Sequence, residues 1–92
     1  MNEFNEKNEL SSDIGKLINL EVLILNGNQL TFLPKEIGNL KNLKELWLNQ
    51  TNIERLPMEI SNLKKLEKLS TEGSYVSKDE IDRIKKLLPN LN

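Results

Sequence analysis

The sequence predicts an α/β solenoid: a short parallel sheet on the concave face, short helices or 3₁₀ turns on the convex face, and a C-terminal capping helix. Three observations predict it. Apolar residues recur every 23 positions, a turn-forming segment precedes an alternating segment within the repeat, and the chain ends in an amphipathic helical pattern. We therefore expect residues 1–9 to form a weak N-terminal cap, residues 10–76 three repeats, and residues 77–92 the capping helix.

The repeats become visible when the chain is shifted by 23 residues, which aligns segments 10–32, 33–55 and 56–78. Five columns then hold the same apolar residue in all three segments, and a sixth stays aliphatic. The columns are Leu10/Leu33/Leu56, Ile14/Ile37/Ile60, Leu17/Leu40/Leu63, Leu20/Leu43/Leu66, Leu23/Leu46/Leu69 and Leu30/Ile53/Val76. One segment cannot bury its apolar side alone, but stacked neighbours can.

Each repeat contains an alternating segment, "EVLIL" at 21–25 and "KELWL" at 44–48, as is typical of a β-strand. Parallel strands need a crossover between them. The stretch "LPKEIGNLKN" supplies it, because its apolar residues recur every three positions, which favours a short helix or 3₁₀ turn. We expect Pro34 and Pro57 at the first position of these turns, where a missing N–H costs little.

A hairpin is the alternative for residues 26–29, "NGNQ", since Asn-Gly is a strong turn signal. The corresponding stretches of the other repeats, "NQTN" and "EGSY", are poor hairpin turns. The recurrence therefore favours the solenoid.

The pattern resembles the leucine-rich repeat family, whose signature is LxxLxLxxNxL. The first repeat holds all of it, as Leu20, Leu23, Leu25, Asn28 and Leu30. Thr51 replaces the Asn in the second repeat, and Thr71 and Ser74 replace a leucine and the Asn in the third. The LPxxIxxL half is similar to the 23-residue bacterial class. The resemblance, over residues 10–76, implies a curved solenoid with an Asn ladder, which we expect to weaken towards the C-terminus because a hydroxyl reaches less far.

The C-terminal segment has the signals of a capping helix. "SKDE" is a capping box with Ser77 at the N-cap and Glu80 three residues later, and Val76 and Ile81 are placed as a hydrophobic staple. Pro89 stops the helix. The expected apolar stripe is Ile81, Ile84, Leu87, Leu88 and Leu91. A helix covering the last repeat is favoured over a membrane or partner helix.

The N-terminal end has little apolar cover, since residues 1–9 offer only Met1 and Phe4. The first strand edge, residues 21–25, is expected to be exposed or loosely shielded. Three explanations stay open: a fragment of a longer array, two chains that cover each other, or Phe4 as a plug. Mutual cover predicts a concentration-dependent dimer.

Strand alternation places Trp47 on the concave face, because Leu46 and Leu48 on either side occupy buried leucine positions. Residues 23 apart form columns there: Ile24, Trp47, Ser70; Val22, Glu45, Lys68; and Asn26, Asn49, Glu72. An apolar middle inside a polar ring is typical of an interaction hot spot. Packing for stability alone is the alternative. The predicted partner-binding residues are Trp47, Ile24, Val22, Glu45, Asn49, Ser70, Glu72 and Lys68.

Composition restricts the chemistry of this 92-residue single domain. Thirteen basic and 14 acidic residues give a net charge of −1, which argues against nucleic-acid binding. Without cysteine or histidine, thiol and imidazole catalysis and thiolate or imidazole metal sites are missing. The carboxylates Glu45 and Glu72 are not flanked by a base, a metal-ligand cluster or a phosphate-binding loop, so we expect no enzyme, metal or cofactor. No apolar run is long enough to span a membrane, and no signal peptide is recognisable, so we expect a cytoplasmic protein unless a signal has been removed.

Together these observations predict a non-catalytic module that binds an unidentified protein partner through its concave sheet face. A docking patch at Lys64, Lys65 and Lys68 is a less specific possibility. The alternative function is a structural or self-associating solenoid segment, as an edge-paired or swapped homodimer through the exposed N-terminal edge.

Overall fold

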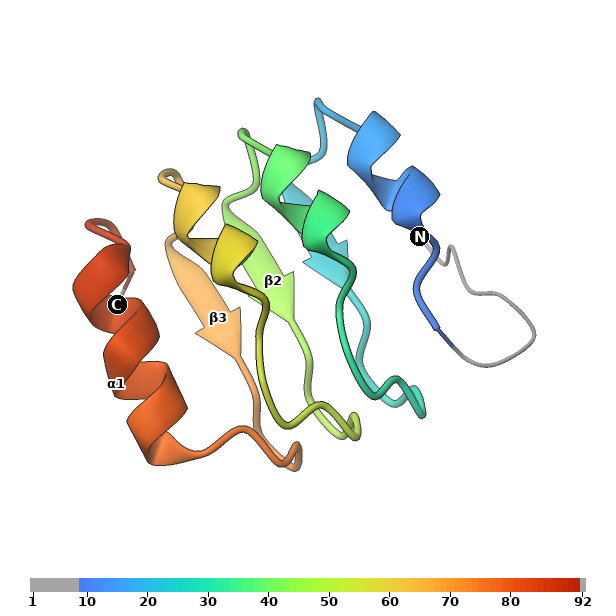
Figure 1. Cartoon of the computed structure of the whole chain (residues 1–92), viewed down its shortest axis with the longest axis vertical. Coiled ribbons are helices and arrows are strands. Elements are labelled where there is room, and N and C mark those ends of the chain that lie inside the picture. Colours follow the sequence, from blue (N-terminus) through green and yellow to red (C-terminus); the bar gives the residue numbers. More distant parts are fainter. Residues whose placement is uncertain (1–8, 92) are drawn as a thin grey trace.

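The computed structural model describes residues 9–91 and shows a two-layered solenoid (Figure 1). Its elements are η1 (Ser12–Lys16), β1 (Val22–Ile24), η2 (Lys35–Asn39), β2 (Glu45–Trp47), η3 (Met58–Asn62), β3 (Lys68–Ser70) and α1 (Lys78–Leu87). The strands form one parallel sheet in the order β1-β2-β3, and the 3₁₀ helices η1 to η3 form the second layer. Because β1 pairs in parallel with β2, the solenoid is confirmed and the hairpin alternative is excluded.

The core is built from the 23-residue columns. Ile14, Ile37 and Ile60 are fully buried under the three 3₁₀ helices. Burial falls only at the ends of the stack: Leu17 is partly buried, whereas Leu40, its equivalent in the second repeat, is 0% exposed. Each repeat therefore completes the core of its neighbour, as expected for a solenoid.

Pro34 and Pro57 lie one position earlier than predicted. Each is the residue before its 3₁₀ helix, with extended backbone (φ −67°, ψ 154° at Pro34; φ −65°, ψ 155° at Pro57). The carbonyl of Pro34 accepts the first helical bond, from the N–H of Ile37 at 3.0 Å. The fixed φ of proline suits this capping position as well as the first helical one.

Close stacking of the 3₁₀ helices depends on glycine. A Cβ added at Gly38 of η2 would lie 2.8 Å from both the Cβ and the carbonyl oxygen of Glu59 in η3. A Cβ at Gly15 of η1 would meet Glu36 in the same way, at 2.9 Å. The third repeat has Ser61 at this position, where α1 and not another repeat follows. Glycine therefore occupies this position in the two 3₁₀ helices, η1 and η2, against which a further repeat stacks.

The Asn ladder keeps its main bond in all three repeats. Asn28 Nδ2 donates to the carbonyl of Leu25 at 2.8 Å. Thr51 Oγ1 donates to Leu48 at 2.9 Å, and Ser74 Oγ donates to Thr71 at 2.6 Å. The prediction that the hydroxyls would reach less far is wrong for this bond, because the loop brings each one to the carbonyl three residues earlier. Asn28 adds a second bond, to the carbonyl of Asn26 at 3.3 Å.

Helix α1 covers the last repeat and is anchored at both ends. At its start, Ser77 Oγ accepts from the N–H of Glu80 at 3.1 Å, as the predicted N-cap requires. At its end, Lys64 Nζ donates to the carbonyl of Leu87 at 3.3 Å, and Asn90 Nδ2 donates to the carbonyl of Lys64 at 3.0 Å. The two bonds that involve Lys64 join the end of the helix to the third repeat.

Two predictions about α1 need correction. Glu80 does not return its carboxylate to the N-cap but accepts from the N–H of Leu56 at 3.1 Å and from Arg83 at 2.8 Å. Leu87 is 41% exposed and does not join the buried stripe. At 3.6 residues per turn it lies roughly a sixth of a turn around the helix from Ile84, on the side away from the core.

Glu80 supplies a prediction for stability. Replacing Glu80 by Ala is expected to lower the free energy of unfolding by about 2 kcal/mol at pH 7, because a charged group hydrogen-bonded to Leu56 and Arg83 is lost. Hydrogen bonding from Arg83 lowers the pKa of Glu80 most, partial burial opposes this, and the Leu56 N–H lowers it further. Urea denaturation measures the difference. Asp79→Ala, in the same first turn, is the control and is expected to change stability by about 0.5 kcal/mol or less.

The stability contributed by Glu80 should decrease at low pH. A carboxyl whose pKa is lowered in the folded state contributes stability that is present above its unfolded pKa, near 4.5, and is lost as the pH falls through the folded value. The difference between wild type and Glu80→Ala should therefore shrink below pH 4.5. A difference that stays constant down to pH 2 would contradict this role.

The predictions for Met1 and Phe4 lie outside the described residues. At the first described repeat, β1 is the edge strand of the sheet, as predicted, with Val22 and Ile24 exposed.

Candidate functional site

The concave face is built by three aligned strands. Their register places Val22, Glu45 and Lys68 in one column and Ile24, Trp47 and Ser70 in another. Leu46 and Leu48 are 0% exposed, whereas Trp47 between them is half-buried. Trp47 therefore lies on the face opposite the core, where strand alternation predicted it.

The Trp47 ring is held by two neighbours on this face. Its indole Nε1–H donates to Glu45 Oε1 at 2.9 Å, and Lys68 Nζ lies 4.7 Å from the ring centroid. An ammonium group at this distance is attracted to the negative face of the ring. Both partners come from the neighbouring column, so the register of the sheet fixes the orientation of the ring.

The apolar part of the face lies on β1 and β2. Ile24 is 52% exposed and Val22 is 43% exposed, and Ile24 pairs directly with Trp47. On the other side of Trp47 the column ends in Ser70. The concave face is therefore apolar towards the N-terminal edge of the sheet and polar towards α1.

The column at the strand ends has a structural role that the sequence did not reveal. Asn26 Oδ1 accepts from the N–H of Asn49 at 2.7 Å, and Asn49 Oδ1 accepts from the N–H of Glu72 at 2.9 Å. Ser70 Oγ also donates to Asn49 Oδ1, at 2.7 Å. These bonds join consecutive repeats. Asn49 and Ser70, predicted as partner-binding residues, are therefore already used to position one another.

Gln50 is a feature of this edge that the sequence-based prediction missed. It has φ 58°, and the equivalent residues of the other repeats, Gly27 and Gly73, have φ 77° and 76°. Left-handed backbone is unfavourable for a residue with a Cβ. The signal was present in the sequence, since Gln50 stands in a column of glycines. Its neighbours Asn26, Asn49, Glu72 and Gly73 line with it a shallow polar hollow of about 440 Å³.

Replacing Gln50 by Gly is expected to raise the free energy of unfolding by about 0.5 to 1 kcal/mol. Relief of the left-handed strain exceeds the extra freedom that glycine has in the unfolded chain. Thermal and urea denaturation measure the change. Gln50→Ala retains the Cβ and should give no such gain; equal stabilisation by both variants would show that the side chain and not the backbone is responsible.

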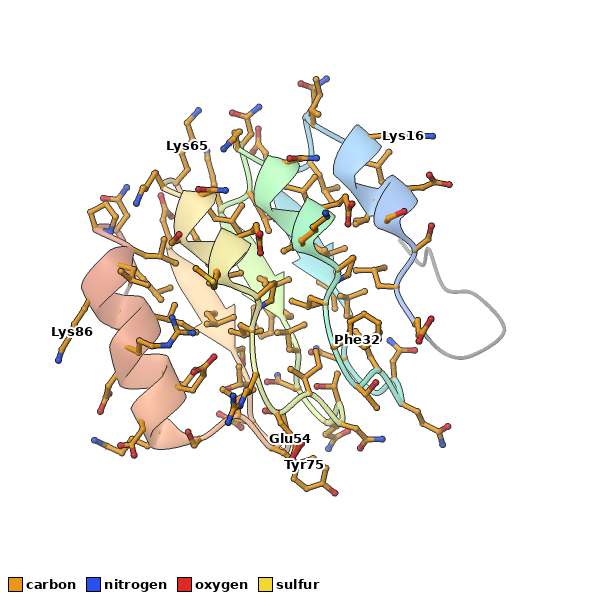
Figure 2. The ribbon with its side chains drawn as sticks, viewed as in Figure 1. Lys16, Phe32, Glu54, Lys65, Tyr75 and Lys86 are labelled. Atoms are coloured by element: carbon orange, nitrogen blue, oxygen red, sulfur yellow. The ribbon has the colours of Figure 1, made fainter. Side chains whose placement is uncertain are left out.

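The three lysines of the possible docking patch each have a contact within the chain. Lys65, labelled in Figure 2, lies at the edge where the strands begin, and its Nζ donates to Asn42 Oδ1 at 2.9 Å. Lys64 Nζ donates to the carbonyl of Leu87 in α1, and Lys68 Nζ lies over the Trp47 ring. The three ammonium groups therefore have separate local partners.

Within residues 9–91, no group of three or more carboxylates is arranged to hold a metal ion. Over the same residues, no helix has the length and apolar character needed to cross a membrane.

Comparisons with known proteins agree with this architecture. A family model described as a leucine-rich repeat region matches residues 2–89. A solved structure of a leucine-rich repeat protein from Leptospira interrogans is similar, with 34% sequence identity and a TM-score of 0.72. The alignment covers 90% of this chain and 27% of that one, so this chain spans about a quarter of the Leptospira protein's length. No curated protein matches.

The family is generally a non-enzymatic scaffold, and its architecture supports a protein-interaction type of module. The repeat columns, the parallel sheet opposite the 3₁₀ helices and the family match lead to one conclusion: this chain belongs to the leucine-rich repeat family.

Proposed function

We propose that this chain is a non-catalytic module that binds a protein partner through its concave sheet face, with Trp47 as the anchor. The observation that carries the proposal is the fixed position of the Trp47 ring beside exposed Ile24. Aromatic anchors surrounded by polar residues dominate the energetics of protein interfaces.

Binding through Trp47 benefits from its fixed geometry. Glu45 and Lys68 restrict the ring before any partner arrives, so less side-chain entropy is lost on binding. The two charged residues also place one carboxylate and one ammonium group at the rim of the apolar surface. A partner that presents an apolar side chain flanked by polar groups is complementary to this arrangement.

The predicted site residues have different roles in this proposal. Trp47, Ile24 and Val22 provide the apolar contact, and Glu45 and Lys68 position the ring. Asn49 and Ser70 keep the repeats in register, and Glu72 forms the polar rim at the strand ends. We therefore expect substitutions at Asn49 to act on stability before they act on binding.

An affinity capture with the wild-type chain and Trp47→Ala tests the proposal. The partner should be retained by wild type and lost with Trp47→Ala, while circular dichroism shows both chains folded. Met58→Ala is the matched control, because Met58 is 80% exposed in η3, in the layer opposite the sheet. Retention of the same partner by Trp47→Ala, or its loss with Met58→Ala, would contradict binding through the concave face.

A second candidate function is self-association at the N-terminal edge. Leu17 and Leu20 are only partly buried, although their equivalents in the second and third repeats are 0% exposed. Among the described residues, the first repeat has no stacking neighbour on this side. A second copy of the chain would bury this apolar surface. Light scattering should then show a dimer that forms with increasing concentration, and a monomer at all concentrations would exclude it.

A further inference from the structure

The free edge of β1 presents a defined set of backbone groups. Leu25 N–H donates to the carbonyl of Trp47 at 2.8 Å, and Gly27 N–H donates to Asn49 at 2.9 Å, so alternate residues of this segment face β2. The backbone groups of Val22 and Ile24 therefore point to the opposite side. No other strand of the described residues lies there, because β1 ends the sheet.

Among the described residues, this edge has few of the features that prevent strand pairing. Natural edges are protected by lysines, prolines, bulges or covering elements. Between residues 20 and 26, "LEVLILN", Glu21 is the one charged residue, and there is no lysine or proline. The two residues whose backbone faces outward, Val22 and Ile24, also have exposed apolar side chains. The edge is therefore suited to pairing with another apolar strand.

The opposite end of the solenoid is closed. Helix α1 lies beside the third repeat and is bonded to it through Glu80 to Leu56 at its start and Lys64 to Leu87 at its end (Figure 1). Head-to-tail stacking of copies is therefore blocked. Association through the N-terminal edge must be isologous, and an isologous contact closes as a dimer and does not extend into a fibre.

We infer that two copies of this chain pair their β1 strands antiparallel about a two-fold axis at Leu23. This inference rests on the self-association proposed above and specifies its geometry. Val22 then lies opposite the partner subunit's Ile24, and Ile24 opposite the partner subunit's Val22. Each of these pairs exchanges two backbone hydrogen bonds. This register uses the whole of β1, because Leu23 is its central residue.

The pairing joins two concave faces into one. A two-fold axis perpendicular to the sheet keeps both concave faces on the same side, and the two three-stranded sheets become continuous. The row Trp47–Ile24 then continues into the partner subunit's Val22, so the apolar surface of each copy is extended by the other. The dimer therefore presents two Trp47 rings on one surface.

Light scattering on the full chain tests the association. Wild type should change from monomer to dimer with concentration, and Ile24→Lys should remain monomeric because two like charges are brought to the paired edge. Met58→Lys, an apolar-to-lysine change at an exposed position of η3, and Trp47→Ala should both still dimerise. Circular dichroism establishes that each variant is folded.

Disulfide formation tests the register, since the chain has no cysteine of its own. Residues in a hydrogen-bonded antiparallel pair have Cα atoms about 5.5 Å apart, within the range for a disulfide. A mixture of Val22→Cys and Ile24→Cys chains should therefore crosslink rapidly. Either variant alone should not, because identical residues lie roughly 8 to 9 Å apart in this register, from strand rise and spacing.

The outcomes separate the two proposals. A wild-type chain that stays monomeric overturns both the self-association and its geometry. A dimer that persists in Ile24→Lys, or that crosslinks through Ile24→Cys alone, leaves self-association standing and overturns the register. Loss of the dimer in Met58→Lys also overturns the edge pairing. Dimerisation lost only in Ile24→Lys, together with crosslinking only in the mixture, supports it.

Discussion

Replacing Leu46 by Ala is expected to lower the free energy of unfolding by about 3 kcal/mol, within the usual cost of truncating a buried leucine. Leu46 is 0% exposed and belongs to the central strand, where it pairs with Leu23 on one side and Leu69 on the other. Both flanking repeats hold the backbone around it, so the cavity cannot collapse easily. For a small domain this is a large part of the total stability.

The neighbouring residue provides the matched comparison. Trp47→Ala removes more atoms, yet its effect should stay within about 1 kcal/mol, because Trp47 is half-buried on the opposite face of the same strand. Urea denaturation of both variants and wild type measures the contrast. If Trp47→Ala cost as much as Leu46→Ala, the tryptophan would be a structural residue and the proposed binding site would lose its anchor.

Replacing Gly38 by Ala is expected to lower the free energy of unfolding by about 1 to 3 kcal/mol through overpacking. The added Cβ would lie 2.8 Å from the backbone carbonyl of Glu59, which cannot rotate away as a side chain does. The neighbouring 3₁₀ helices η2 and η3 must therefore move apart. In the absence of this contact, the change would favour folding slightly, since alanine has less freedom than glycine in the unfolded chain. The steric cost must exceed that gain.

Ser61→Ala is the control for this prediction, because Ser61 occupies the same repeat position and already carries a Cβ. It loses one exposed hydrogen bond, from Ser61 Oγ to the carbonyl of Met58 at 2.9 Å. We expect a change of about 0.5 kcal/mol or less. Thermal unfolding of Gly38→Ala and Ser61→Ala measures the difference. Equal midpoints would show that the stacked 3₁₀ helices tolerate a methyl group at Gly38.

The period of the sequence predicted the fold because a solenoid repeats one set of contacts. Once Leu23, Leu46 and Leu69 align, the strand between them must place Ile24, Trp47 and Ser70 on the other face. The N-cap of α1, Ser77, was predicted from a local motif, in which Glu80 follows three residues later. These predictions depend only on local sequence patterns and on which side of a strand each residue takes.

Two contacts that the sequence did not predict have a different physical cause. Glu80 bonds Leu56 and Arg83 instead of completing the capping box, because the docked helix brings another backbone N–H within reach. Asn49 bonds Glu72 and Ser70 because adjacent loops lie one strand apart. In each case the choice of partner depends on distances between repeats, which the sequence pattern does not contain.

By itself, then, the sequence determined the repeat, the buried columns, the capping helix and the outward direction of Trp47. Its periodicities of two and of 23 residues assign each side chain to a face and to a neighbour. Only the tertiary structure decided that Glu45 and Lys68 hold the Trp47 ring, and that Gly38 is needed for close stacking. It also decided that Asn26 and Asn49 bond the backbone of the next repeat. Side-chain contacts depend on ångström-scale distances between stacked repeats, and those distances are set only when the whole solenoid packs.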